Sequence, residues 1–408
     1  MKRVVVTGMS AVTPVGLTWK SVSEKLLKME TGIQFMPEWD AFSDLNTRLA
    51  APIDDFVKPA HYTRRLTRSM SRGSEMAAFV TEEALRQAGL LGDERITNGD
   101  MGIAYGSSSG NLEAILDFGS MLLNQASGTL NANSYIKMMA HTAPVNLAVF
   151  FKLKGRLFTT SSACTSGSQG IGSAYDAIKH GQQMYMVAGG TEELSPAQAA
   201  VFDTLFATST KNDTPKTTPS PFDIDRDGLV IGEGAGTLIL EELDHAKARG
   251  ATILAEVVGY GTNCDGTHVV QPTKETMRRA MELALEDAHL DTSNIGYVSA
   301  HGTATVQGDI AESLATAELF GCNVPISAFK SFTGHTLGGC GAMEAWLAIE
   351  MMNAGWFHAT ANLNNIDPAC GDLDYIQGEP RKLDCEYVMS NNFAFGGINT
   401  SLIFKRWA

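Results

Sequence analysis

Short runs rich in β-branched residues alternate with amphipathic segments along nearly the whole chain. The runs at 4–8, 101–106 and 297–302 are typical of buried strands that end in glycine or small polar residues. Other segments place apolar residues three and four positions apart, as one face of a helix does. These predicted helices span residues 75–90, 166–179, 274–289, 309–320 and 341–354. Strands that alternate with helices predict largely parallel sheets covered by helices, which is the α/β class.

The strand pattern restarts near residue 250. Segment 253–264 (ILAEVVGYGTNC) is similar to segment 3–12 (RVVVTGMSAV), because each is an apolar run that leads into glycine and small polar residues. A duplicated unit of this kind would give two similar halves. We therefore expect one half at residues 1–250 and the other at residues 251–408.

Composition narrows the class of protein. With 44% hydrophobic and 19% charged residues, the chain is typical of a compact globular protein. Its formal net charge of -14 argues against a nucleic-acid binder, since phosphate contacts need concentrated Lys and Arg. No stretch reaches the roughly 20 uninterrupted apolar residues of a membrane-spanning helix. The six cysteines are scattered without ligand-pair spacing, so we expect a cytoplasmic protein.

One basic stretch stands against the acidic background. Between Phe56 and Ser74 the chain carries no acid and five cations: Lys58, Arg64, Arg65, Arg68 and Arg72. The four-residue spacing of Arg64, Arg68 and Arg72 would place them on one face of a helix. Such a face is either solvated or a docking surface for an acidic partner, and the sequence leaves both interpretations open.

Cys164 lies in a segment with the features of a nucleophile turn. It follows small polar residues and precedes the predicted helix 166–179, whose apolar stripe includes Ile171 and Tyr175. At the N-terminus of a helix, the positive end of the macrodipole favours thiolate over thiol. A buried structural cysteine is the alternative. The strand-turn-helix context favours a nucleophile, and the other cysteines lack such a context.

Two histidines and a lysine leave the ends of predicted strands. His301 ends the run near 297, Lys330 leaves the run near 325, and His335 follows across a glycine-containing turn. Active sites of open α/β sheets form at strand ends, so these side chains are candidates to act with Cys164. Metal binding is the competing use of such residues. The absence of closely spaced ligand pairs argues against it.

Four segments together carry a family resemblance. They are ACTSG around Cys164, HGTAT from His301, KSFTGH from Lys330, and NNFAFGGIN from Asn391. In order and spacing they resemble the β-ketoacyl-carrier-protein synthases of types I and II, over nearly the whole chain. The resemblance implies the thiolase fold: two similar βαβαβαββ halves in a five-layered α-β-α-β-α arrangement, usually as a homodimer.

The resemblance also implies catalytic roles. Cys164 becomes the acylated nucleophile, while His301 and His335 serve decarboxylation of a malonyl thioester. Lys330 becomes a supporting cation that positions the histidines. Its expected carboxylate partner is Glu312 or Glu344, two acids that the following predicted helices carry.

Further residues match binding positions of the family. The backbone N–H groups of Cys164 and Phe395 would form an oxyanion hole, with Phe395 also as gate of the acyl pocket. Thr303 and Thr305 resemble positions that hydrogen-bond the phosphopantetheine arm. The remaining predicted pocket residues are Ser109 and Phe202. Carrier proteins are acidic, so the resemblance gives the cluster Arg64, Arg65 and Arg68 a docking role.

The implied reaction is that of a 3-oxoacyl-[acyl-carrier-protein] synthase. A decarboxylating Claisen condensation joins a Cys-bound acyl group to malonyl-carrier protein and extends fatty acyl or polyketide chains by two carbons. The substrates would be held on the 4'-phosphopantetheine of an acyl carrier protein, and no metal or organic cofactor is expected. The partner subunit would be a second copy or another ketosynthase-like chain.

The chain departs from the usual residues of the family at Ser109, Ala304, Asn392, Ala394 and Ile398. Its motifs also resemble the discrete ketosynthases of bacterial aryl-polyene clusters. A non-catalytic, chain-length-factor subunit is the main alternative, but such subunits lack the nucleophile. A thiolase would need a second catalytic cysteine near the C-terminus, where this chain has the NNFAFGG segment instead. A type III synthase would use Cys, His and Asn, and the histidine of KSFTGH argues against that class. A dinucleotide-dependent dehydrogenase would show GxGxxG after the first strand, and this chain has no such motif there, which excludes that class.

Overall fold

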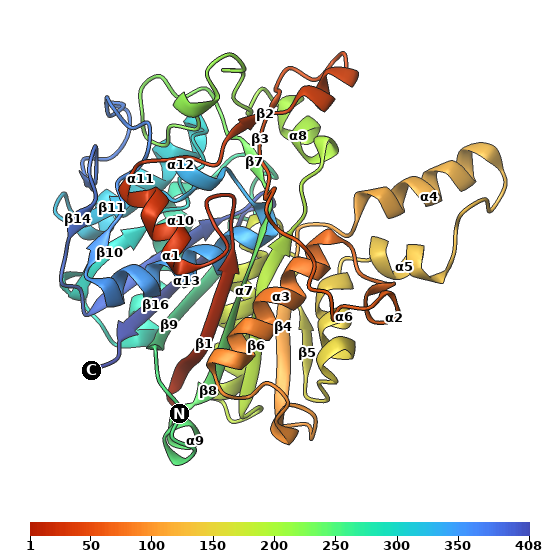
Figure 1. Cartoon of the computed structure of the whole chain (residues 1–408). Helices are drawn as coiled ribbons and strands as arrows, with labels where there is room; N and C mark the ends of the chain where they lie inside the picture. Colours follow the sequence, from red (N-terminus) through yellow and green to blue (C-terminus); the bar gives the residue numbers. More distant parts are fainter.

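The computed structural model, which describes residues 1–408, is built around one mixed sheet of eleven strands (Figure 1). In spatial order they are β13 (Asp374–Tyr375), β11 (Pro325–Ser327), β10 (Ile295–Ser299), β15 (Tyr387–Phe393), β16 (Ile398–Arg406), β9 (Ala255–Cys264), β1 (Val4–Val12), β8 (Gly234–Glu242), β6 (Tyr185–Glu192), β4 (Met101–Gly106) and β5 (Leu157–Thr159). The strands are mostly buried on both faces, which explains their continuous apolar runs.

The two arms of this sheet repeat one pairing pattern. In the first arm β4 pairs parallel with β6, and β6, β8 and β1 then pair antiparallel in turn. In the second arm β10 pairs parallel with β15, and β15, β16 and β9 follow in the same way. A short antiparallel contact between β1 and β9 joins the arms. This repeated topology accords with a duplicated unit, while the boundary at residue 250 stays a prediction.

Helices form three layers around the two arms. The central helices α7 (Ser166–Lys179) and α13 (Cys340–Ala354) pack on each other and on strands of both arms. The first arm is covered outside by α3 (Arg72–Gln87) and α6 (Thr142–Phe151). The second arm is covered by α10 (Lys274–Ala288) and α11 (Val306–Phe320). The α/β class and the five-layered thiolase arrangement expected from the sequence are confirmed.

Shorter elements decorate this core. The remaining helices are α1 (Trp19–Leu27), α2 (Arg64–Thr67), α4 (Leu112–Asn124), α5 (Ala132–Met138), α8 (Pro196–Asp203), α9 (Leu243–Ala248) and α12 (Lys330–Thr333). The 3-10 turns are η1 (Pro37–Ala41), η2 (Glu94–Ile96), η3 (Ala163–Thr165), η4 (Pro215–Thr217), η5 (Thr292–Asn294) and η6 (Leu337–Gly339). There are also two small sheets. One contains β2 (Gln34–Phe35), β3 (Leu49–Ala51) and β7 (Ile231–Gly232), and the other contains β12 (Trp356–Phe357) and β14 (Arg381–Lys382). No helix has the length and apolar character to cross a membrane.

The basic stretch does not form the single helix that its spacing predicted. Helix α2 ends at Thr67, and α3 begins only at Arg72 after the N-cap residue Ser71. The guanidinium of Arg72 pairs with the buried carboxylate of Glu233 at 2.8 Å, although its side chain stays partly exposed. The prediction of one helical face is therefore wrong, because the helix breaks between Thr67 and Arg72, and Arg72 is held by Glu233 apart from the other arginines.

Helices α4 and α5 project away from the body of the molecule (Figure 1). Their large apolar side chains are exposed to an unusual degree: Leu116 at 68%, Leu122 at 78% and Leu123 at 85%. Strand β5 pairs only with β4, so its other edge is free within this chain. Both features are typical of a surface that another chain covers.

Close backbone packing brings the first and second halves together beneath the site. A Cβ atom at Gly190, on β6, would lie 2.3 Å from the carbonyl oxygen of Gly338 and 2.7 Å from the Cα of Gly167. No side chain larger than hydrogen fits there. The glycine therefore lets the start of α7 and the turn η6 meet over the end of β6.

Candidate active site

Cys164 lies in η3, directly before α7, and is 4% exposed. The preceding Ala163 has φ of +50°, so the backbone makes a sharp turn into the nucleophile position. Burial raises the pKa of the Cys164 thiol to about 11, although Lys330 and the backbone N–H groups of Phe395 and Cys164 act to lower it. Burial therefore opposes the thiolate that the helix N-terminus was expected to favour.

His335 lies beside this sulfur. Its Nε2 is 2.9 Å from Sγ of Cys164, and its Nδ1 accepts a hydrogen bond from the backbone N–H of Leu337 at 3.2 Å. Burial, followed by the charge of Lys330, holds the pKa of His335 well below its ordinary value. The ring is therefore neutral, and because Nδ1 is an acceptor, the proton is on Nε2 facing the sulfur.

His301 has the same tautomer for a different reason. Nζ of Lys330 lies 3.1 Å from Nδ1 of His301, and an ammonium group can only donate. The imidazole proton is therefore on Nε2, on the side that lines the cavity. Burial and Lys330 hold the pKa of His301 well below its ordinary value. The rings of His301 and His335 lie 5.2 Å apart at 87°, so two neutral N–H donors converge on one space.

Lys330, at the start of α12, uses all three of its donors. It bonds to Oε1 of Glu344 at 2.5 Å, to the carbonyl oxygen of His301 at 2.7 Å, and to the ring of His301. Lys330 and Glu344 are each 1% exposed, so this is a fully buried ion pair. Of the two acids expected beside Lys330, Glu344 is thus the one that contacts it.

Glu312 instead fixes the loop that carries His301. Its two carboxylate oxygens accept from the backbone N–H groups of His301 at 2.6 Å and Gly302 at 2.7 Å. Burial raises the pKa of Glu312 to about 8, against the lowering effect of these N–H donors. Farther along, the hydroxyl groups of Thr303 and Thr305 lie 2.8 Å apart.

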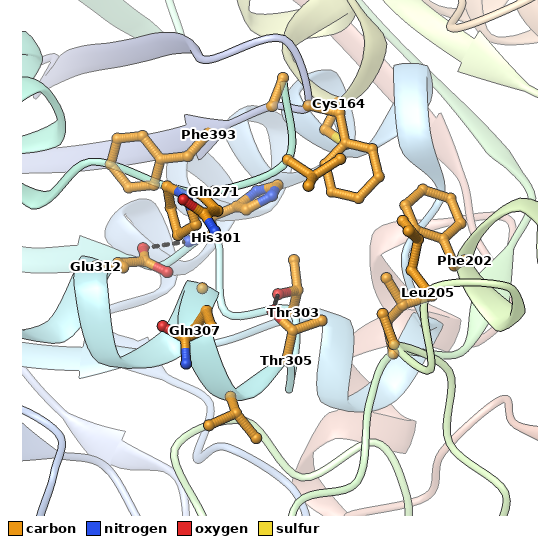
Figure 2. A pocket seen from close by; sticks show the side chains of 18 of the residues that line it. Cys164, Phe202, Leu205, Gln271, His301, Thr303, Thr305, Gln307, Glu312 and Phe393 are labelled. Carbon is orange, nitrogen blue, oxygen red and sulfur yellow. Dashed lines mark hydrogen bonds between the residues drawn. The ribbon is translucent and has the colours of Figure 1, made fainter. Parts of the chain in front are cut away.

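A cavity of about 400 Å³ opens onto these groups. Cys164, His301 and His335 line it together with Thr303 and Thr305. Figure 2 shows His301 and Phe393 on one side of the cavity, with Phe202 and Leu205 on the opposite side. The rings of Phe202 and Phe395 are in contact, with centroids 5.0 Å apart. The site therefore joins a thiol and two N–H donors to an approach with polar and aromatic walls.

Ser109, which is predicted to line the acyl pocket, does not line this cavity. The hydroxyl of Ser107 donates to the carbonyl oxygen of Ser109 at 2.7 Å, and the N–H of Ser108 donates to Glu192 at 2.8 Å. These bonds fold the loop toward a separate, small polar cavity that Ser109 lines with Ser74. The predicted place of Ser109 in the acyl pocket stays a prediction.

Several site residues were not found by sequence reasoning. Leu205, Phe206, Val269 and Val270 line the cavity from loops whose residues follow no periodic pattern. Asn392 was noted only as a departure from the family, although its amide contacts Glu344 at 2.6 Å. Its position inside the NNFAFGGIN motif was the sequence signal that it belongs to the site. The difference in residue type alone did not indicate which group its amide would contact.

The donor atoms of the site also include two groups with metal-ligand chemistry: Cys164, His301 and His335, and His301, Cys340 and Glu344. Their hydrogen bonds oppose metal binding. A metal on either Nε2 would force the imidazole proton onto Nδ1, where it would face the N–H of Leu337 or the ammonium of Lys330. A metal on Nδ1 of His301 would meet that same ammonium, which lies 3.1 Å from this nitrogen. A donor facing a donor is unfavourable in a buried site, so the arrangement suits proton donation better than ligation.

The predicted docking residues Arg64, Arg65 and Arg68 are exposed on and directly after α2. No carboxylate of the chain pairs with them within 4.0 Å, unlike Arg72 with Glu233. Three free guanidinium groups therefore lie close together on the surface of an acidic protein.

Comparison with known proteins agrees with this geometry. The family described as beta-ketoacyl synthase matches its N-terminal domain to residues 1–246 and its C-terminal domain to residues 254–364. A 3-oxoacyl-[acyl-carrier-protein] synthase 2 of Synechocystis is 36% identical over 412 residues, covering 100% of this chain and 98% of that protein.

Two solved structures are also similar over the full length of both chains. A beta-ketoacyl synthase from Burkholderia phymatum is 58% identical with a TM-score of 0.99. A ketosynthase bound to the hexaketide, in complex with its type II polyketide acyl-carrier protein, is 27% identical with a TM-score of 0.88. This chain therefore belongs to the β-ketoacyl synthase family and is an acyltransferase.

Proposed function

We propose that this chain is a 3-oxoacyl-[acyl-carrier-protein] synthase whose nucleophile is Cys164. The observation that carries the proposal is the contact of 2.9 Å between the Cys164 sulfur and Nε2 of His335, in a cavity that the second N–H donor, His301, also lines. This combination suits acyl transfer followed by formation of an enolate. We place the reaction in fatty acid biosynthesis, because the relatives carry the names 3-oxoacyl-[acyl-carrier-protein] synthase 1 and 2.

In the first half-reaction, the Cys164 sulfur attacks the acyl thioester of a loaded carrier protein. The carbonyl oxygen becomes an oxyanion beside the backbone N–H groups of Cys164 and Phe395. The bond to the pantetheine sulfur breaks, and the thiol proton of Cys164 leaves with that sulfur. The raised pKa of Cys164 suits this exchange, because a thiol enters and a thiol leaves without a lasting thiolate.

In the second half-reaction, a malonyl thioester occupies the same approach. Its C–C bond to the carboxylate breaks, CO2 leaves, and the electron pair of that bond forms an enolate. The enolate oxygen accepts hydrogen bonds from the Nε2–H groups of His301 and His335. The enolate carbon attacks the thioester on Cys164. The C–S bond then breaks, which releases a β-ketoacyl product and returns the sulfur as a thiolate that takes a proton from solvent.

The approach to the site supports a carrier-bound substrate. Thr303 and Thr305 line the cavity and can hydrogen-bond a pantetheine amide, while Phe202 and Phe395 offer aromatic contacts to an acyl chain. Arg64, Arg65 and Arg68 give an acidic carrier protein a place to dock. No cofactor beyond the carrier's own 4'-phosphopantetheine is needed. The cytoplasm suits a protein with six free cysteines and a nucleophilic thiol.

A chain-length-factor role is the alternative. Such a subunit forms a complex with a ketosynthase but needs neither a thiol nor two N–H donors in its cavity. Cys164, His301 and His335 converge on one space here, which favours the catalytic role. We further infer a homodimer, since the exposed leucines of α4 and the free edge of β5 need a cover.

Replacing the nucleophile tests the function directly. After incubation with acyl-carrier proteins that bear saturated, polyene or aryl-polyene groups, intact mass should show acylation of the wild type and none of Cys164→Ala. Cys264→Ala, which changes an exposed cysteine, should be acylated like the wild type. Acylation independent of Cys164, or no acylation of the wild type, would favour the partner-subunit role. The preferred acyl group distinguishes a fatty-acid from an aryl-polyene pathway.

Replacing the two histidines should separate the half-reactions. Loss of one oxyanion donor typically slows a reaction by about 10²–10³-fold, so His301→Ala and His335→Ala should each lower CO2 release from malonyl-carrier protein by that order. His335→Ala should also slow acylation, because only His335 contacts the sulfur. Equal acylation rates in the two variants would contradict these roles.

Reversing the basic cluster should weaken docking without altering the chemistry. The triple variant Arg64→Glu, Arg65→Glu and Arg68→Glu should raise KM for acyl-carrier protein about 10-fold at low salt, with kcat unchanged. The difference should shrink at high salt, because exposed charges are screened. A charge-matched control carries glutamate at three other exposed positions: Lys20, Lys28 and Lys382. An equal rise in KM for the control would exclude a local docking surface.

Charging the projecting helix should disrupt the homodimer. We expect the wild type to sediment as a dimer and the double variant Leu122→Asp, Leu123→Asp as a monomer, since two carboxylates cannot be buried unpaired in an interface. Val57→Asp, at another exposed apolar position, should remain dimeric. A monomeric wild type would instead point to a heterodimer with a second ketosynthase-like subunit.

A further inference from the structure

Asn392, on β15, is a wholly buried amide within the polar centre of the site. Its Nδ2 donates to Oε2 of Glu344 at 2.6 Å. The same nitrogen lies 3.4 Å from Nδ1 of His301 and 3.8 Å from Sγ of Cys340. The amide therefore faces the ion pair of Lys330 and Glu344 from the side of the strand.

Only one orientation of this amide fits its surroundings. A carboxylate can only accept hydrogen bonds, so the NH2 group must point at Glu344 and the carbonyl oxygen must point away. In that orientation Oδ1 of Asn392 has no hydrogen-bond partner in the chain. A buried acceptor without a partner is unfavourable. The hydrogen bond that Nδ2 of Asn392 donates must therefore offset the cost of leaving Oδ1 without a partner.

That contribution can be followed bond by bond. Each oxygen of Glu344 receives one donor, Oε1 from Lys330 and Oε2 from Asn392. With its carboxylate saturated, Glu344 holds the ammonium of Lys330 in place. Lys330 in turn donates to Nδ1 of His301 and so fixes the Nε2–H that faces the cavity. Asn392 thus acts on His301 through two intervening side chains, and its Nδ2 also contacts Nδ1 of His301 directly at 3.4 Å.

We propose that Asn392 is a positioning residue for the decarboxylation step, which keeps Glu344 ionised and thereby holds His301 in its donating tautomer. The inference rests on the proposed function of the site. It predicts a selective effect. The acylation of Cys164 depends on the sulfur, the oxyanion donors and His335, and Asn392 hydrogen-bonds none of these groups.

The pH dependence of decarboxylation provides an independent readout. The titratable groups that face Glu344 are Lys330, Cys340, His301 and Tyr297. Burial disfavours the charged forms of Cys340, His301 and Tyr297, so Lys330 is the only charge among them. Burial also raises the pKa of Glu344, and Lys330 and Asn392 act to lower it. Removing Asn392 should raise that pKa further, so activity should be lost at a higher pH as the solution is acidified.

The test compares two neighbouring asparagines. Asn392→Leu removes the donor at similar volume, and Asn391→Leu makes the same change at a residue that is equally buried but directed toward Met281 on α10. Asn392→Leu should lower CO2 release from malonyl-carrier protein by about 10-fold or more, as small misplacements of a catalytic group do. Its rate of Cys164 acylation should stay within about 2-fold of Asn391→Leu.

Asn392→Ser, which retains a hydroxyl donor, should recover part of the lost decarboxylation and part of the shift of the acid limb. It also keeps the test decisive if Asn392→Leu does not fold. Equal losses in both half-reactions, or an unmoved acid limb, would reduce Asn392 to a structural residue. A wild type that neither acylates nor decarboxylates would refute the proposed function instead, so the two failures are distinguishable.

Discussion

The fully buried ion pair of Lys330 and Glu344 is the interaction on which the site depends. Removing one partner of such a pair typically costs about 3–5 kcal/mol, because it leaves an uncompensated charge out of water. The pair is tolerated here because its hydrogen-bonding capacity is used: Lys330 has three acceptors and each oxygen of Glu344 has a donor. The effect of the ion pair is to fix the position of a catalytic group. The direction of the His301 proton follows from the donor that Lys330 presents to Nδ1.

The site could not form within either half of the chain. Cys164 enters from the turn before α7, whereas His301 and Lys330 leave the ends of strands in the other arm of the sheet. They meet because the two central helices pack back to back between the arms. The close approach at Gly190 removes the side-chain layer that would otherwise hold the two turns apart. The duplicated topology thus places strand ends of both arms around one cavity.

The sequence predicted the parts that depend on local pattern. Helix 166–179 has the bounds that its apolar spacing indicated, and His301 and Lys330 follow strand ends as expected. Properties set by tertiary surroundings could not be read in this way. Burial opposes the expected lowering of the Cys164 pKa, and Ser109 lines a separate small cavity instead of the one at Cys164. The groups that surround Cys164 are distant from it in sequence, and so is Glu192, which accepts from the N–H of Ser108 in the loop of Ser109.

Burial keeps the reacting side chains of the resting site uncharged. The same burial strengthens the hydrogen bonds that the N–H donors of the site can make. The same desolvation that raises the pKa of Cys164 lowers those of His301 and His335, so the reacting atoms are neutral before substrate arrives. The nearby positive charge of Lys330 is already balanced by Glu344. An enolate or oxyanion that forms there is therefore the new charge in a weakly screening environment, where fixed N–H donors act more strongly than in water. A site that ionised its thiol in advance would lose this difference between resting and reacting states.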